Sequence, residues 1–170
     1  MLEPEIYRIH KSLNQTSTSY IYGEIESNTM YDIIKTINYE NCRFLDVGSG
    51  SGNVLMDLAN IEGLSVCGIE IDEDRYKKSV QKMDMFENSI ELIHNDFEKI
   101  YFGDYDIIYC CNCIFEDEDN ERLYKKIIRE FTGKCFLFTY DKTLLPYYVG
   151  SYIINTSWVK HTVLYYFEVV

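Results

Sequence analysis

The chain alternates between short apolar runs and longer segments in which apolar side chains recur every three or four residues. The short runs predict buried β-strands, and the periodic segments predict amphipathic helices. The predicted strands are 42–47, 64–71, 89–95, 105–115 and 134–140, and the predicted helices are 28–38, 52–60, 72–86 and 118–131. Two further strands are expected on either side of a turn near 156–161.

This order of elements favours an α/β fold in which a mostly parallel sheet is covered by helices. Parallel neighbours need crossover connections, which are right-handed in almost all sheets, whereas the C-terminal pair can close as a hairpin. The run "YDIIYCCNCIF" (105–115) is apolar enough to be buried on both faces. We expect a short N-terminal segment, 1–27, followed by a single domain, 28–170.

Charge narrows the classes of partner. The chain has 16 basic and 28 acidic side chains, a formal net charge of −12. Nucleic-acid binding through phosphates normally needs a basic face, and the sequence shows no such DNA-binding patch. A negative field favours a cationic partner, although the same charge also serves solubility. The sequence shows no apolar run of membrane-helix length and no signal peptide, and its six scattered cysteines fit reduced thiols in an intracellular protein.

The stretch "FLDVGSGSGN" (44–53) carries the strongest chemical signal. A strand, a glycine-rich turn and a helix bring backbone N–H groups close to a ligand. The glycine spacing does not fit G-x-G-x-x-G; the pattern D-x-G-x-G-x-G resembles the first motif of class I methyltransferases. This resemblance implies S-adenosylmethionine as cofactor and S-adenosylhomocysteine as product. The Asp46 carboxylate would stabilise the positive charge of the cofactor. The methionine part of the cofactor would lie against the loop residues Gly48, Ser49, Gly50 and Asn53.

Acids after the next two strands agree with this reading. Glu70 ends the second predicted strand, where it could accept both ribose hydroxyls, with Ile71 beside it. Asp96 and Phe97 follow the third strand, where they could take the adenine amine and the adenine face. Acids at strand ends also cap helices, so each position alone is compatible with a purely structural role.

Three further segments are "YIYGEI" (20–25), "IIYCCNCIF" (107–115) and "TSWVKHTVLYYFEV" (156–169). Together they resemble the Dot (disruptor of telomeric silencing) family of histone lysine methyltransferases, especially its short stand-alone members in giant DNA viruses. That family combines Y-G-E-T, D-x-G-S-G-x-G-Q, G-V-E, G-D-F, V-N-N-F-A-F and S-W-T-G-K-P-V-S-Y-Y. The matching positions here are Tyr22-Gly23-Glu24, Asp46 to Gly52, Gly68-Ile69-Glu70, Asp96-Phe97, Asn112, Phe115, Ser157-Trp158, Val163 and Tyr165-Tyr166.

The resemblance implies a class I, Rossmann-like fold with a seven-stranded sheet, helices on both faces and a C-terminal hairpin. It implies methyl transfer to a lysine of a core histone or nucleosome. The expected location is the nucleus or, for a viral protein, the nucleus or cytoplasm of the host cell. Tyr22, Phe115, Trp158 and Tyr165 would line an aromatic channel for the lysine, in which the amine loses its proton more readily. Tyr22, Glu24 and Asn112 would also contact the cofactor.

The chain departs from the family pattern at the reacting position. The first Asn of N-N-F-A-F aligns with Cys111, and the second aligns with Asn112. Either Cys111 occupies the catalytic place, or Asn112 takes it over through a local bulge, because alternation along a strand points the two side chains to opposite faces. No metal site is expected, since neighbouring strand cysteines point apart.

The acidic run at Glu116, Asp117, Glu118 and Asp119 follows the fourth strand and borders the expected substrate entrance. It can cap the next helix, and we also expect it to recruit a basic histone segment. Two alternatives remain open at this level. One is a class I methyltransferase acting on a small molecule or nucleic acid, and the other is a catalytically weakened, histone-binding relative.

Overall fold

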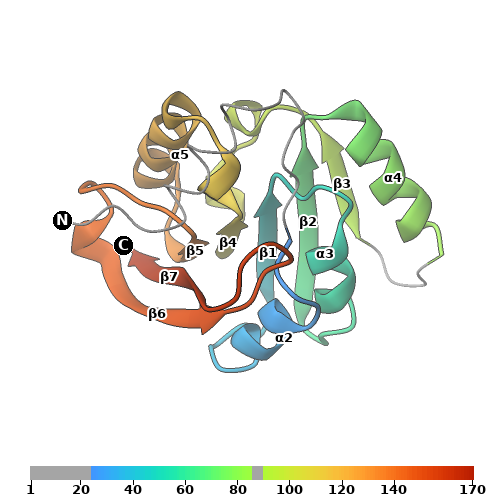
Figure 1. Cartoon of the computed structure of the whole chain (residues 1–170), viewed down its shortest axis with the longest axis horizontal. Coiled ribbons are helices and arrows are strands. Elements are labelled where there is room, and N and C mark those ends of the chain that lie inside the picture. Colours follow the sequence, from blue (N-terminus) through green and yellow to red (C-terminus); the bar gives the residue numbers. More distant parts are fainter. Residues whose placement is uncertain (1–23, 86–89) are drawn as a thin grey trace.

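A computed structural model describes residues 24–85 and 90–170. Its centre is a seven-stranded sheet in the order β3-β2-β1-β4-β5-β7-β6 (Figure 1). The strands are β1 (Cys42–Val47), β2 (Leu64–Glu70), β3 (Glu91–His94), β4 (Ile107–Cys110), β5 (Gly133–Leu137), β6 (Tyr148–Ile154) and β7 (Thr162–Val169). The first five strands are parallel, and β7 runs antiparallel to both of its neighbours. The predicted α/β fold with a C-terminal hairpin is confirmed.

The helices cover the two faces of this sheet. α2 (Thr29–Ile34), α3 (Asn53–Leu58) and α4 (Glu73–Met83) contribute to the apolar core on one face, which we call the α3 face. α5 (Asp117–Glu130) packs on the opposite face, which we call the α5 face (Figure 1). Two separate cores, one on each face, explain why β4 and the last four residues of β1 are buried.

One strand prediction is wrong in its length. The fourth strand ends at Cys110, and a short 3-10 turn over Asn112–Ile114 follows, so 105–115 is not a continuous strand. The cause lies outside the run: the Asn112 side chain accepts hydrogen bonds from backbone N–H groups just beyond β5. The argument from strand alternation therefore does not apply at Cys111 and Asn112.

The carboxyl ends of the parallel strands lie along one edge of the sheet, and the β6–β7 loop lies at the same edge because β7 runs antiparallel to β5. Ile25 forms a β-bridge with Thr156 in that loop, and Glu26 N–H donates to the Asn155 carbonyl at 3.1 Å. The start of the described chain is thereby tied to its C-terminal hairpin.

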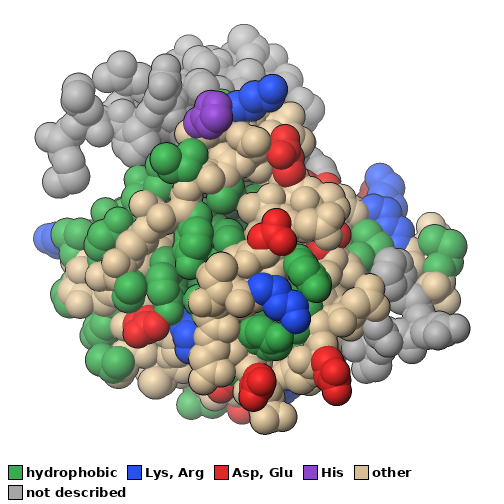
Figure 2. Space-filling view, turned by 90° about the horizontal axis from the view of Figure 1, so that it is seen from below, with side chains coloured by type: hydrophobic (Ala, Val, Ile, Leu, Met, Phe, Trp, Pro, Cys, Tyr) green, Lys and Arg blue, Asp and Glu red, His purple; other side chains and the backbone are tan. Residues whose placement is uncertain are grey.

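The acidic charge is spread over the surface. Figure 2 shows one face on which Asp and Glu side chains are scattered among apolar and polar groups. In the part of the chain that the structure describes, no helix is long and apolar enough to cross a membrane.

Candidate functional site

The glycine loop lies between β1 and α3 and is anchored to β2. Gly48 and Gly52 adopt φ values of 78° and 81°, a left-handed conformation that strongly favours glycine. The N–H groups of Gly48 and Ser49 donate to the Ile69 carbonyl at 2.8 and 2.9 Å, and Gly50 N–H donates to Glu70 Oε2 at 2.8 Å. The loop is therefore held in place by backbone geometry and by one carboxylate.

Asp46 is the last residue but one of β1, beneath this loop, and is only 2% exposed. Within residues 24–85 and 90–170, no group hydrogen-bonds to its carboxylate. Burial, followed by the negative charges of Glu70 and Glu24, raises the pKa of Asp46 well above its usual range. A buried carboxylate without a partner is costly, and such groups cluster at functional sites. This position fits a ligand that brings positive charge.

Glu70 is also buried, and both of its oxygens are engaged. Oε2 accepts from Gly50, while Oε1 accepts from the Asp72 N–H at 2.8 Å and from Arg75 at 3.3 Å. Its predicted contact with ribose stays a prediction, although a carboxylate retains acceptor capacity beyond these bonds. Ile71, the next residue, is an apolar side chain that is 64% exposed, so it presents a surface on which a flat ring could pack.

Glu24 connects the N-terminal segment to the glycine loop. Its carboxylate accepts from Ser51 Oγ at 2.9 Å and from the Asn53 amide. Its main chain pairs with the β6–β7 loop, because Ser157 N–H donates to the Glu24 carbonyl at 2.8 Å. The structure thus brings together three sequence segments that were linked only by resemblance. Tyr22, predicted beside them, lies outside the described residues.

Phe97 and Phe115 form an aromatic pair at the same edge. Their ring centroids are 6.1 Å apart and their planes lie within 13°. A Cβ added to Gly48 would lie 3.6 Å from the Phe115 ring, so this ring covers the start of the glycine loop. Asp96, just before Phe97, caps a short 3-10 turn by accepting from the Glu98 N–H at 3.0 Å, as the structural alternative predicted. Its contact with adenine stays a prediction.

Asn112 holds a different position from the one expected of a reactive amide. It is fully buried, and its Oδ1 accepts from the N–H groups of Phe138 and Thr139 at 2.9 and 3.1 Å. Its Nδ2 lies 2.7 Å from Asn120 Oδ1 and 2.8 Å from Thr139 Oγ1. Since these bonds use both ends of the amide, Asn112 forms a structural clamp between the ends of β4 and β5, and its predicted catalytic and cofactor-binding roles stay predictions.

Cys111 is partly exposed at the end of β4, and its Sγ lies 3.7 Å from Cys113 Sγ. This contact and burial raise the pKa of the Cys111 thiol well above its usual range. The thiol is therefore neutral near pH 7, which disfavours a covalent nucleophile. Among the described residues, no group of three or more His, Cys, Asp or Glu side chains could hold a metal ion.

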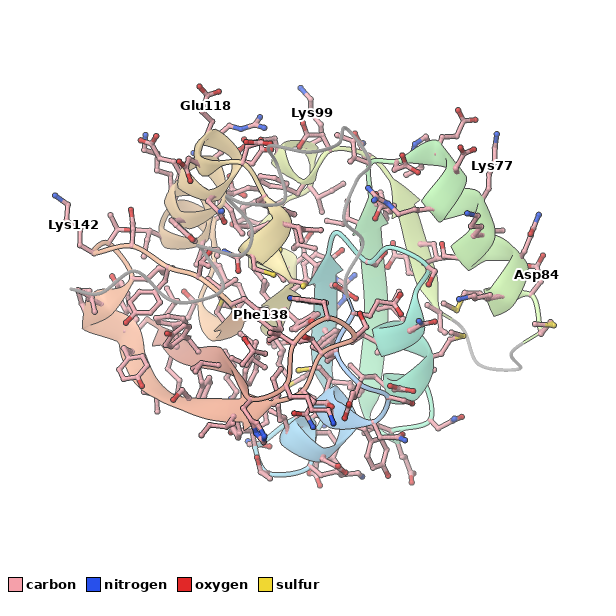
Figure 3. All side chains as sticks on the ribbon, in the orientation of Figure 1. Lys77, Asp84, Lys99, Glu118, Phe138 and Lys142 are labelled. Carbon is pink, nitrogen blue, oxygen red and sulfur yellow. The ribbon has the colours of Figure 1, made fainter. Side chains whose placement is uncertain are left out.

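The predicted aromatic channel is not assembled from all its members. Trp158 packs against the core of the α3 face, with its ring 6.4 Å from that of Phe138, which lies near the middle of the molecule (Figure 3). Tyr165 packs on the α5 face, in a T-shaped contact 4.8 Å from Tyr140. Neighbouring residues of β7 alternate between the two faces, so the register of β7 places Tyr165 away from Trp158.

The acidic run forms the start of α5, which begins at Asp117. Glu116, Asp117 and Glu118 are exposed, and Glu118 projects away from the body of the molecule (Figure 3). Asp119 forms an ion pair with Arg122 one turn later. Acidic residues in a first helical turn are favourable, so part of this run serves the helix.

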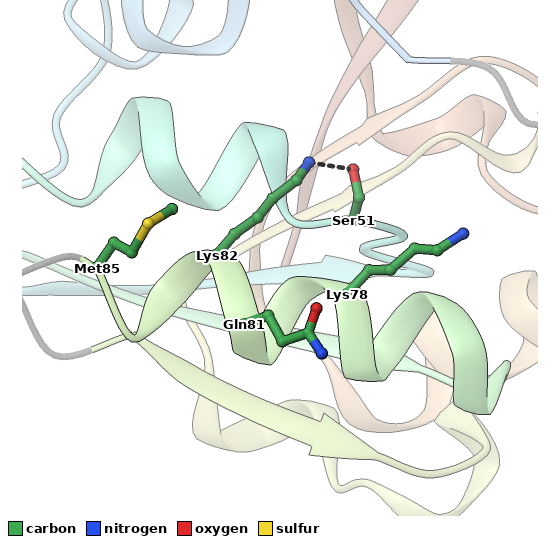
Figure 4. Close-up of a pocket in the computed structure, with 5 residues that line it drawn as sticks. All are labelled: Ser51, Lys78, Gln81, Lys82 and Met85. Atoms are coloured by element: carbon green, nitrogen blue, oxygen red, sulfur yellow. Dashed lines mark hydrogen bonds between the residues drawn. The ribbon is translucent and has the colours of Figure 1, made fainter.

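Lys82 was not predicted as a site residue from the sequence. Its Nζ donates to Ser51 Oγ at 3.1 Å (Figure 4). It also donates to Asn53 Oδ1 at 3.0 Å. Nothing in the run "KKSVQKM" distinguishes this lysine from its neighbours except its place on the helix face next to the buried Met83.

These residues fit S-adenosylmethionine, which carries an ammonium and a sulfonium group. The buried Asp46 would face its positive charge, the glycine loop would lie against its methionine part, and Ile71 and Phe97 offer apolar surface to adenine. The same carboxylates would disfavour a pyrophosphate, so the site is unsuited to a dinucleotide.

Comparisons with known proteins agree with this geometry. The fold is similar to an RNA methyltransferase from Salinibacter ruber bound to S-adenosyl-L-homocysteine, with a TM-score of 0.63 and 14% identity over 82% of this chain and 88% of that one. It is similar to a SAM-dependent methyltransferase from Aquifex aeolicus, with a TM-score of 0.62 and 16% identity over 96% and 98%. Phosphoethanolamine N-methyltransferase 2 from Haemonchus contortus gives a TM-score of 0.55 and 19% identity, over 68% of this chain and only 30% of that one.

A comparison with curated proteins gave no match. Residues 44–131, slightly more than half of the chain, match the family described as "Methyltransferase domain". The matched range runs from β1 and the glycine loop to the end of α5, and so includes Asp46, Glu70 and Phe97. The chain therefore belongs to this methyltransferase family and is a class I methyltransferase that uses S-adenosylmethionine.

Proposed function

We propose that the protein methylates a lysine side chain of a core histone, as a Dot-type enzyme. The observation that carries this proposal is the position of Glu24. Its side chain bonds the glycine loop through Ser51 and Asn53, and its main chain pairs with Ser157 of the β6–β7 loop. The Y-G-E and S-W motifs are characteristic of the Dot family, and Glu24 and Ser157, which align with them, meet at one site.

Charge supports a basic protein as the substrate. The net charge is −12, and the exposed carboxylates of Glu116, Asp117 and Glu118 lie directly after the turn that follows β4. A lysine-rich tail would be attracted to this edge before docking. A nucleic-acid backbone would be repelled by the same charges.

The chemistry at the edge also suits an amine acceptor. Bound S-adenosylmethionine would supply the methyl group, whose bond to the sulfonium sulfur breaks as the new N–C bond forms, so that S-adenosylhomocysteine leaves with a neutral sulfur. The lysine nitrogen must be neutral to attack, and its free pKa is about 10.4. Phe115 offers a low-polarity aromatic wall, and the Cys111 thiol stays neutral, so neither would hold the amine in its charged form. The lysine ammonium loses its proton to water before the attack.

The direct experiment is to incubate the protein with methyl-labelled S-adenosylmethionine and, separately, core histones, nucleosomes, RNA, DNA and phosphoethanolamine. We expect label on a histone lysine, located by mass spectrometry of the digested product. The Asp46→Asn variant serves as the control with reduced cofactor binding. Exclusive labelling of RNA, DNA or phosphoethanolamine would refute the lysine proposal and leave the cofactor assignment intact.

The acidic start of α5 gives a second readout. The combined variant Glu116→Gln, Glu118→Gln removes two exposed negative charges from the entrance. We expect KM for histone to rise about two- to fivefold at low salt, with kcat unchanged, and the difference to shrink at 0.3 M salt. A matched variant, Glu73→Gln with Asp74→Gln at the start of α4, removes the same charge elsewhere. Equal effects from both pairs would mean that general charge, and not this rim, recruits the substrate.

Cys111 tests the Dot-type assignment itself. If Cys111 stands where the family has its reactive-site Asn, the Cys111→Asn variant should increase kcat on histone by severalfold. Cys42→Asn is the matched control. Cys42 is also a partly exposed cysteine, but it begins β1 and so lies at the opposite edge of the sheet from Cys111. A Cys111→Asn variant that is folded but slower than the parent would contradict this assignment.

A further inference from the structure

Lys82, Ser51, Glu24 and Asn53 form a closed ring of hydrogen bonds around the glycine loop. Lys82 Nζ donates to Ser51 Oγ at 3.1 Å and to Asn53 Oδ1 at 3.0 Å. Ser51 Oγ and Asn53 Nδ2 in turn donate to the two oxygens of Glu24. Every bond runs from the ammonium toward the carboxylate, so the two neutral residues are polarised in the same sense.

This ring joins three parts of the chain that the sequence separates. Glu24 belongs to the N-terminal segment, Ser51 and Asn53 flank Gly52, and Lys82 lies in the last turn of α4. The loop itself contains three glycines with positive φ, which leave its backbone with little intrinsic preference for one shape. An external brace on both sides of Gly52 therefore fixes the shape that the cofactor meets.

The surroundings single out Lys82 among the α4 lysines. A surface groove of about 330 Å³ next to the loop is lined by Ser51, Lys78, Gln81, Lys82 and Met85 (Figure 4). Lys78 lies one turn before Lys82 in the same groove but is exposed, and it makes no hydrogen bond or ion pair within the described residues. Lys82 is half-buried and forms no direct ion pair there; its negative partner, Glu24, is reached only through Ser51 and Asn53.

We propose that Lys82 is a positioning residue for cofactor binding, which holds Ser51, Asn53 and Glu24 in the arrangement that shapes the glycine loop. It touches neither substrate nor reacting atoms in this role. The inference rests on the cofactor site and not on the identity of the methyl acceptor, so it stands or fails independently of the histone proposal.

The test is calorimetric titration of the full chain with S-adenosylhomocysteine and with S-adenosylmethionine. We expect Lys82→Met to raise both Kd values about tenfold, equivalent to about 1.4 kcal/mol, because the loop loses its brace. Lys82→Arg should recover most of the affinity. Lys78→Met, the matched control, should change Kd less than twofold.

Comparing the two ligands separates positioning from simple charge. S-adenosylmethionine carries a sulfonium that S-adenosylhomocysteine lacks, so removing a nearby cation would favour the former selectively. If Lys82→Met strengthens S-adenosylmethionine binding relative to S-adenosylhomocysteine, Lys82 acts through its field and the proposal is wrong. Unchanged Kd values for both ligands would overturn it equally.

A double-mutant cycle with Glu24 tests the ring directly. In a Glu24→Gln background the carboxylate that completes the ring is gone, so Lys82→Met should then raise Kd less than threefold. Independent, multiplicative effects would contradict the ring. The melting temperature without ligand is measured for every variant. Should Lys82→Met not fold, Lys82→Gln replaces it, and a fall in melting temperature with unchanged Kd would assign Lys82 a purely structural role.

Discussion

Asn112 offers the sharpest test of the structure, because its two assignments predict opposite outcomes. As a reactive amide it would matter for kcat and little for stability. As a clamp it should matter mainly for stability, since its side chain joins the turn after β4 to the backbone at Phe138 and Thr139. The variant Asn112→Ala removes the clamp without adding bulk.

The magnitude follows from the groups that the variant leaves behind. Two backbone N–H groups, at Phe138 and Thr139, lose their acceptor, and Asn120 Oδ1 loses a donor at 2.7 Å. A buried polar group without a partner costs about 1–3 kcal/mol. Asn112 itself is 0% exposed, so little water can substitute at its position. We therefore expect Asn112→Ala to lower the free energy of unfolding by about 3–5 kcal/mol, and the melting temperature by about 10 °C.

Urea unfolding followed by circular dichroism measures this loss, with Asn95→Ala as the matched control. Asn95 Oδ1 also accepts a backbone N–H, from Asp96 at 2.9 Å, but Asn95 is exposed, so water replaces the bond. The control should lose less than about 1 kcal/mol. An Asn112→Ala variant as stable as the control, with kcat reduced, would refute the clamp and restore the reactive amide.

Two further predictions concern the walls of the site. Asp46→Asn should stabilise the cofactor-free protein at pH 7 on the order of 1 kcal/mol, because it removes a buried charge, yet weaken S-adenosylmethionine binding. The pKa of Asp46 is raised in the folded protein, so folding favours the protonated carboxyl group. The free energy of unfolding should therefore fall as the pH rises from the unfolded-state pKa toward the folded-state pKa. Affinity for the cationic cofactor should rise over the same range, and both trends can be measured by titrations in a pH series. Gly68→Ala should lower the free energy of unfolding by about 1–3 kcal/mol and weaken cofactor binding, because the new Cβ would lie 2.5 Å from Leu55 Cδ1 and 2.7 Å from Ser49 Oγ. Gly150→Ala is the control: its Cβ would have no atom within 4 Å, so it should not change stability in the same denaturation assay.

The parts of the site that follow from local sequence were predictable. Asp46 and Glu70 end strands whose apolar runs are unmistakable, and the glycine loop needs positive φ at its own residues. Asp72 was expected to start a helix, and it caps α4 by accepting from the Arg75 N–H at 2.8 Å. In each case the determining interaction lies within a few residues of the signal.

The misplaced predictions depend on distant contacts. Cys111 looked like part of a strand because its neighbours are apolar, but bonds from the end of β5 to Asn112 stop β4 at Cys110. Tyr165 lies in β7, where strand alternation points it to the α5 face, whereas Trp158 lies in the loop before β7 and packs on the α3 face through contacts that composition does not encode. Lys82 is distinguished only by its contacts with the glycine loop.

The pairing of Glu24 with Ser157 has a consequence for the making of the protein. These residues are 133 positions apart, so their contact is among the last that a chain synthesised from its N-terminus can form. The sheet order adds to this delay, because β7 lies between β5 and β6 and must be translated before β6 can join the sheet. A ribosome-bound chain can complete β1 to β5 and the glycine loop while Glu24 still lacks its main-chain partner, Ser157. A chain arrested before β7 would therefore have the glycine loop but not the contact that ties Glu24 to the C-terminal hairpin.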